Sequence, residues 1–186
     1  MSTELREAAS LALAEIGEIF EKMDGGEIDH FCEQILDAKT IHCFGLGREG
    51  LMIRAFCMRL MHLGLDAHMI GDVTSPCAGG SDLLIVCSGP GDHLMCRSMI
   101  QLGRQSTANV LVITAQPDGP DPLLADVVIT LPAQTMADDR DSERVLPMGT
   151  AFEFAMLLFF DLTANRLREL TGQTTDELRG RHTNLE

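Results

Sequence analysis

The chain has 186 residues, of which 45% are hydrophobic and 23% are charged, and this composition is typical of one soluble globular domain with its own core. The formal net charge of −14 argues against nucleic acid or an anionic membrane surface as a partner, because both require a basic binding face. It leaves a small anionic ligand open, since local dipoles can outweigh a distant field.

The N-terminal part of the chain predicts two helices. Apolar residues at helical spacing extend over residues 3–23 and end at Gly25 and Gly26, and a shorter apolar face runs from Ile28 to Leu36. We expect residues 1–38 to pack on the sheet or on a partner subunit. Because Glu4 and Glu7 stand where a signal peptide has basic residues, no signal peptide is expected.

The middle of the chain alternates between strands and helices. Short apolar runs without strict alternation predict strands that are buried on both faces of a parallel sheet, at residues 40–44, 67–70, 83–87, 110–114 and 127–131. Helical patterns lie between them at 50–63, 93–105 and roughly 121–125. The predicted fold is therefore a single α/β domain over residues 1–186, with a five-stranded parallel sheet between two layers of helices.

The C-terminal third begins with a strongly charged stretch at residues 137–144, which predicts a solvated or mobile loop. A long apolar helix over about 149–170 follows, and it needs partners on most of its sides. The sheet supplies one partner, and a second subunit is a candidate for the other. The longest apolar run, from Phe154 to Phe160, is too short to span a bilayer.

Six cysteines are present, but no Cys-x-x-Cys pair occurs, which argues against a zinc knuckle or a thioredoxin-type motif. Most of them lie in apolar stretches, where a free cysteine behaves as a small hydrophobe. This usage predicts a cytoplasmic protein. Asp92, His93 and Cys96 form only a weak metal-ligand pattern, so we expect neither a metal nor a cofactor.

Two glycine-rich turns follow predicted strands, where open α/β sheets bind ligands. The first runs from Gly45 to Gly50 and the second from Ser88 to His93. Such turns present backbone N–H groups to phosphates, yet Pro90 has no N–H and Asp92 carries a negative charge. The first turn also matches G-x-G-x-x-G, with Asp72 placed for a ribose, so a dinucleotide site is an alternative. A second glycine turn is not part of that fingerprint.

Several blocks carry a family resemblance that extends over nearly the whole chain. They are Gly45–Arg48, Ala55–Gly64, the Asp82–Gly91 strand and turn, Pro147–Glu153 and Arg181–Glu186. Together they resemble the 6-phospho-3-hexuloisomerase branch of the sugar isomerase (SIS) domain family. The resemblance implies a flavodoxin-like sheet, a homotetramer (or a dimer), and isomerisation of a sugar phosphate without a metal.

Isomerisation through an enediol needs a base that moves a proton between adjacent carbons and an acid that handles the oxygen protons. The resemblance implies that Glu153 is the base; the alternative is a solvated glutamate on a helix face. Apolar neighbours such as Phe152 and Phe154 favour a raised carboxyl pKa. The resemblance also implies that the tail 171–186 brings His182 to an active site, in a neighbouring subunit; the alternative is an exposed histidine in a frayed terminus.

The candidate substrate-binding residues depart from the family pattern at three positions. Glu49 and Pro90 replace serines, and His93 replaces a threonine. Asp92 and Glu49 could merely complement helix dipoles, as an N-cap and a first-turn residue, and a protonated His93 could donate to phosphate. A sugar without a phosphate, or a binding module without catalysis, are alternative functions. The substrate-binding set is Gly45, Gly47, Arg48, Glu49, Ser88, Gly89, Gly91, Asp92 and His93.

Overall fold

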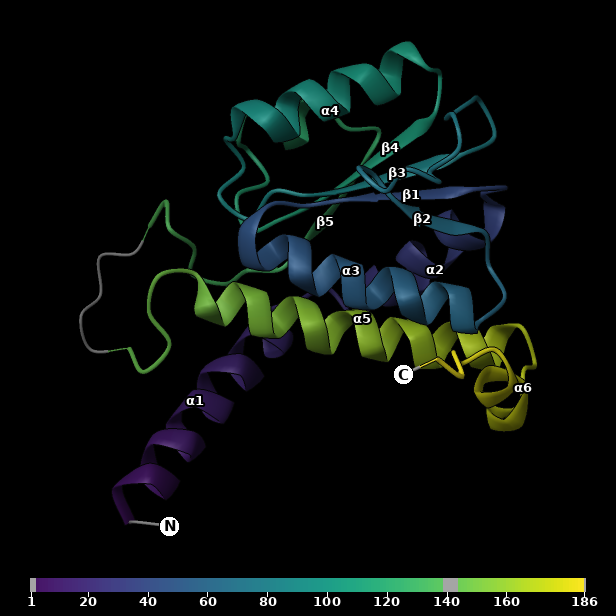
Figure 1. Ribbon diagram of the computed structural model, residues 1–186. Coiled ribbons are helices and arrows are strands. Elements are labelled where there is room, and N and C mark those ends of the chain that lie inside the picture. The colour runs from purple at the N-terminus through teal and green to yellow at the C-terminus, as the bar shows by residue number, and fades with distance from the viewer. Residues whose placement is uncertain (1–2, 139–143, 186) are drawn as a thin grey trace.

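A computed structural model describes residues 3–138 and 144–185 (Figure 1). A parallel five-stranded sheet in the order β2-β1-β3-β4-β5 forms its centre. The strands are β1 (Ile41–Phe44), β2 (Ala67–Met69), β3 (Leu83–Cys87), β4 (Asn109–Thr114) and β5 (Val127–Thr130). These bounds confirm the five strands and the α/β class predicted from the apolar runs.

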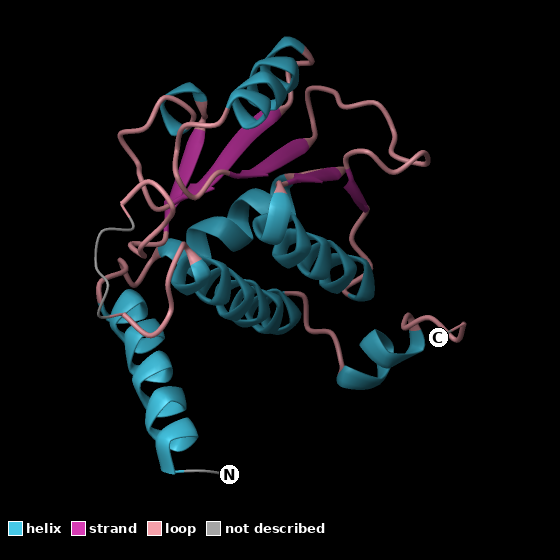
Figure 2. Ribbon diagram, turned by 60° about the vertical axis from the view of Figure 1, so that its left-hand side comes forward, coloured by secondary structure: helices cyan, strands magenta, loops and turns pink. Residues whose placement is uncertain are grey.

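Helices cover both faces of the sheet (Figure 1). They are α1 (Thr3–Glu21), α2 (Glu27–Asp37), α3 (Gly47–His62), α4 (Leu94–Gln105), α5 (Thr150–Leu170) and α6 (Thr175–Gly180), with a short 3-10 helix η1 at Pro122–Leu124. Helix α4 lies on one face, and α3 and α5 lie on the other, as Figure 2 also shows. The helix predicted near 121–125 is this single 3-10 turn.

Burial on both faces explains why the strands have continuous apolar runs. Every residue of β3 is buried, and β3 lies between β1 and β4. The larger core, between the sheet and α2, α3 and α5, contains a group of phenylalanines in which the rings of Phe56 and Phe160 stack at 4.4 Å and those of Phe31 and Phe159 at 5.5 Å. A smaller core under α4 centres on Val86, Ile100 and Val112.

Helix α1 has little contact with this core. Only Ile16 and Ile19 are buried along it, and both figures show its N-terminal end extending away from the sheet. Among the described residues, no helix has the length and apolarity needed to cross a membrane. Of the charged stretch predicted to be a loop, residues 139–143 lie outside the described part of the chain.

Candidate active site

The candidate site lies at the carboxyl ends of β1 and β3, where the strand order reverses and open sheets form a crevice. A cavity of about 300 Å³ lies there between the two glycine turns and the first turn of α5. Six residues predicted from the sequence line it together: Gly47, Arg48, Glu49, Ser88, His93 and Glu153. Leu46, Cys87, Pro90 and Cys96 complete the lining.

Glu153 reaches the cavity from the first turn of α5. Gly149 begins this helix in the left-handed region at a φ of 91°, which a residue with a Cβ rarely adopts, and its carbonyl accepts the Glu153 N–H at 3.1 Å. Only 14% of the Glu153 side chain is exposed, and its Oε2 lies 2.5 Å from Arg48 Nε. Burial raises the pKa of Glu153 above its ordinary value, against the opposing charge of Arg48. Glu153 is therefore a mostly buried, ion-paired carboxyl group and not a solvated one.

Glu49 connects the two glycine turns. From the first turn of α3 its Oε2 accepts the Gly89 N–H at 3.0 Å. Burial raises the pKa of Glu49 to about 7, the Gly89 hydrogen bond opposes that rise, and the charge of Glu153 adds to it. A Cβ at position 89 would lie 2.7 Å from Glu49 Oε1 and 2.7 Å from the Phe152 ring, so this close contact requires glycine.

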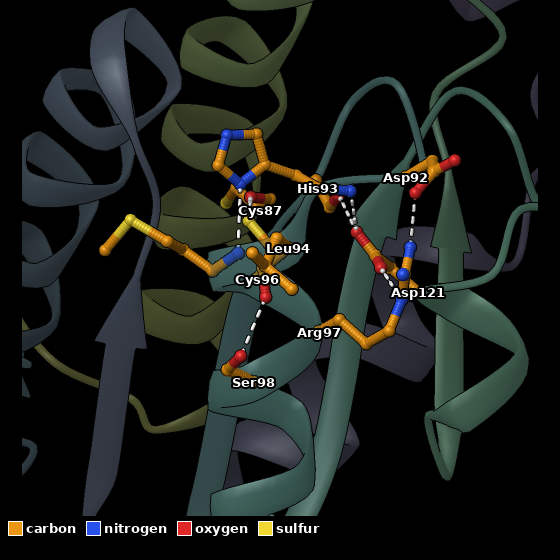
Figure 3. A network of polar contacts seen from close by, with 10 residues as sticks. Cys87, Asp92, His93, Leu94, Cys96, Arg97, Ser98 and Asp121 are labelled. Carbon is orange, nitrogen blue, oxygen red and sulfur yellow. Dashed lines mark hydrogen bonds and ion pairs between the residues drawn. The ribbon is translucent and has the colours of Figure 1, made fainter.

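Asp121, after β4, organises the start of α4 (Figure 3). It is fully buried and accepts hydrogen bonds from Ser88 Oγ at 2.7 Å, from the His93 N–H at 2.8 Å and from Arg97 Nε at 3.1 Å. Arg97 also pairs with Asp92. Asp121 was not among the residues predicted from the sequence, because its turn carries no signal beyond its prolines and glycine.

His93, and not Asp92, occupies the N-cap of α4, so the interpretation of Asp92 as that cap is wrong. The Nδ1 of His93 accepts the Met95 N–H at 3.2 Å, while Asp92 forms an ion pair with Arg97. The protein thus supplies its own acceptors to the N–H groups of Gly89, His93 and Met95 and to the hydroxyl of Ser88.

The other predicted residues shape the turns without lining the cavity. A Cβ at Gly45 would lie 3.1 Å from Ile53 Cγ2 and 3.2 Å from the Gly50 backbone, so the first turn is tightly closed. Gly91, at a φ of 70°, turns the second loop, and its carbonyl accepts the Asp121 N–H at 2.9 Å. Asp72, suggested for a ribose, pairs with Arg54 and is not among the lining residues.

His182 does not lie in the cavity of its own chain. Its ring packs at 5.1 Å on that of His62, the last residue of α3. That helix starts at the cavity and runs for 16 residues, or roughly 24 Å at 1.5 Å per residue. The label C in Figure 1 lies beside the far ends of α3 and α5.

Two further observations concern other ligands. Within the described ranges, no group of three His, Cys, Asp or Glu is placed to hold a metal ion, so Asp92, His93 and Cys96 do not form such a group. A wider cavity of about 520 Å³ lies between α1 and the residues that follow β4 and β5, lined among others by Glu15, Lys22 and Gln134. It contains none of the predicted site residues.

Comparisons with known proteins concern the chain as a whole. No family model matches the chain. The chain is 33% identical over 161 residues to the 3-hexulose-6-phosphate isomerase of Bacillus subtilis (86% of this chain, 87% of the relative) and 32% identical over 177 residues to that of Mycobacterium gastri (95% and 89%). A solved structure from Methanococcus jannaschii, for which a molecular function of 3-hexulose-6-phosphate isomerase was inferred, superposes with a TM-score of 0.84 at 31% identity (97% and 99%).

The Asp121 network leads to a test of how the second turn is held. We expect Asp121→Ala to lower the free energy of unfolding by about 2–4 kcal/mol, because three donors lose a buried acceptor. Urea unfolding measures the effect, and Asp118→Ala, at an exposed aspartate of the same turn, is the matched control. Equal stabilities of the two variants would contradict the assigned role of Asp121.

Proposed function

The chain belongs to the sugar isomerase (SIS) family, in its 6-phospho-3-hexuloisomerase-like branch, and on that premise we propose that it isomerises a sugar phosphate. The reaction moves a carbonyl group to the adjacent carbon, and relatives that span nearly the whole chain bear the name of such an enzyme. The observation that carries the proposal is Glu153, a mostly buried carboxyl group in a cavity between the two glycine turns.

In this proposal Glu153 is the catalytic base. Its carboxylate removes a proton from the carbon beside the substrate carbonyl and returns it to the neighbouring carbon. Its raised pKa favours this role, since a stronger base abstracts a carbon-bound proton more readily. Arg48, which pairs with Glu153, keeps enough of the group ionised and offers a positive charge to the oxygen of the enediol intermediate.

The reaction class is an intramolecular oxidoreduction, in which one carbon of the substrate is oxidised and its neighbour is reduced. We propose that it proceeds without a metal and without a cofactor, because proton carriers and a fixed positive charge meet its chemical needs. Activity is therefore expected to survive dialysis against a chelator.

We also propose that the protein assembles as a homotetramer, or as a dimer. Exposed apolar side chains support this assembly: Leu11 and Leu13 on α1, and Phe154, Leu158 and Leu162 on α5. A neighbouring subunit would cover them, with residues 1–38 in the contact, and the tail 171–186 would bring His182 to the neighbour's cavity to assist ring opening. All six cysteines are free thiols, which supports a cytoplasmic location, testable by cell fractionation.

A second candidate function has its own observation in favour. The Gly89 and His93 N–H groups, which a phosphate on this turn would need, are bound to Glu49 and Asp121. The turn could therefore recognise the hydroxyls of a sugar whose phosphate lies elsewhere or is absent, since carboxylates accept hydrogen bonds from hydroxyl groups. The isomerase chemistry at Glu153 is the same in both candidates.

The base is tested by exchange in heavy water. The protein incubated with 3-hexulose 6-phosphate is expected to place deuterium on the carbon beside the carbonyl. Glu153→Gln is expected to slow this deuterium exchange at least about 100-fold. Exchange undiminished in the variant would remove Glu153 from the mechanism. Thermal stabilisation by the sugar without any exchange, even in the wild type, would instead indicate a non-catalytic binding module.

The role of phosphate is tested by comparing the 6-phosphate with its dephosphorylated sugar. If the protein binds the phosphate, each charge-assisted hydrogen bond lost should lower kcat/KM by roughly 10- to 150-fold. Comparable kcat/KM values for the two sugars would favour the second candidate. Competition by inorganic phosphate gives an independent measurement of the same contact.

The assembly is tested by sedimentation of the intact chain. One chain has a mass of 20.3 kDa, and we expect a species of four such masses, or of two. Asp substitutions at Leu158 and Leu162, which are exposed in the single chain, should dissociate it, because they place charges on the face that the neighbouring subunit would bury. A monomer in the wild type would exclude delivery of His182 to a neighbour.

A further inference from the structure

Isomerisation requires proton transfer at two oxygens as well as at two carbons. Glu153 serves the carbons in the proposed mechanism, and His182 lies beside His62, at the far end of α3 from the cavity of its own chain. The groups that line the cavity differ in their capacity to exchange a proton with substrate oxygens.

Most of these groups are unsuited to that transfer. Arg48 is paired with Glu153, and a guanidinium group has hydrogen-bond donors but no acceptor. Burial raises the pKa of the Cys96 thiol to about 12 and that of Cys87 well above its ordinary value, so both keep their protons. His93 uses its Nδ1 to accept the Met95 N–H, and a ring that cycles through the imidazolium would protonate this nitrogen and lose the cap of α4.

Glu49 remains, and its position is suited to the task. It lines the same cavity as Glu153, is held by the Gly89 N–H at 3.0 Å, and has no cation among the groups that shift its pKa. The charged and titratable groups around it are Glu153 on α5, Arg48 on its own helix, His93 on the second turn, and the thiols of Cys87 and Cys96. The arginine in this set is paired with Glu153, and burial raises the pKa of Glu49 to about 7.

We infer that Glu49 is a second catalytic residue, whose carboxyl group exchanges protons with the two substrate oxygens while Glu153 acts at carbon. This role rests on the proposed isomerase function. Protonated Glu49 gives its proton to the carbonyl oxygen as Glu153 removes the proton from the adjacent carbon, and the C–H electron pair becomes the double bond of the enediol. Glu49 then takes the proton of the second hydroxyl, whose oxygen becomes the new carbonyl, and Glu153 returns its proton to the first carbonyl carbon. Both carboxyl groups end as they began.

The pH dependence of the wild type gives the first test. Catalysis needs Glu153 ionised and Glu49 protonated, so kcat should fall as the pH rises through about 7, the pKa of Glu49. An isomerase whose kcat is flat from pH 6 to 9 would overturn the role of Glu49, even if no variant could be prepared.

The second test is Glu49→Gln, which keeps an acceptor for the Gly89 N–H but has no proton to transfer. We expect kcat with 3-hexulose 6-phosphate to fall at least about 100-fold. The residual kcat of the variant should no longer decrease as the pH rises through 7. Glu27→Gln is the matched control: Glu27 also has a raised pKa and accepts a backbone N–H, from Thr130 at 3.2 Å, but it is not among the cavity residues. It should retain wild-type kcat.

The outcomes separate this inference from the proposed function. If Glu153→Gln abolishes exchange while Glu49→Gln keeps the wild-type rate and its alkaline limb, the isomerase stands and only the role of Glu49 is overturned. If Glu153→Gln has no effect but Glu49→Gln does, the assigned base is wrong and the acid is supported. A wild type that isomerises neither the 6-phosphate nor the dephosphorylated sugar overturns both.

Discussion

A carboxyl group that leaves water must find a cation or hydrogen-bond donors, or else keep its proton, and the crevice between β1 and β3 depends on this constraint. Two carboxyl groups that line it, Glu49 and Glu153, and one beside it, Asp121, meet the constraint in three ways. Asp121 is fully buried and has Arg97 and two further donors. Glu153 has the half-exposed Arg48. Glu49 has one backbone N–H and the repulsion of Glu153, and burial raises its pKa to about 7.

Side-chain packing connects these groups to the fold. Gly89 lies between Glu49 and the ring of Phe152, and Phe152 precedes Glu153 on α5. The close packing of Gly89 against Phe152 therefore also fixes the distance between the loop that follows β3 and the first turn of α5. Because Phe152 and its neighbours Ala155 and Met156 are buried in the larger core, the position of Glu153 depends on the packing of α5 against the sheet.

The sequence predicted what depends on local pattern and on chain order. Continuous apolar runs located the strands, the ends of those strands located Arg48 and Ser88, and the family resemblance added Glu153; all three line one cavity. What it missed are hydrogen bonds between residues far apart in the chain: the Gly89 N–H to Glu49, 40 residues apart, and the Ser88 hydroxyl to Asp121, 33 residues apart. Asp92 has the residue type of an N-cap, but Arg97 on the following helix, α4, lies within reach and pairs with it instead. The residue types and their spacing alone do not show that Asp92 pairs with Arg97 and leaves the N-cap of α4 to His93.

The same constraint links activity to stability. Glu49 has a pKa near 4.5 when the chain is unfolded and about 7 when it is folded, so the folded state binds more protons between these values. The group therefore favours the folded state fully only below about pH 4.5, and this contribution is lost as the pH rises through 7. An ordinary structural carboxylate gives the opposite dependence, because its pKa falls on folding. A serine at position 49 would remove the cost in stability above neutral pH. It would also remove a proton carrier from the cavity. Stability alone therefore gives no reason for a carboxyl group at this position.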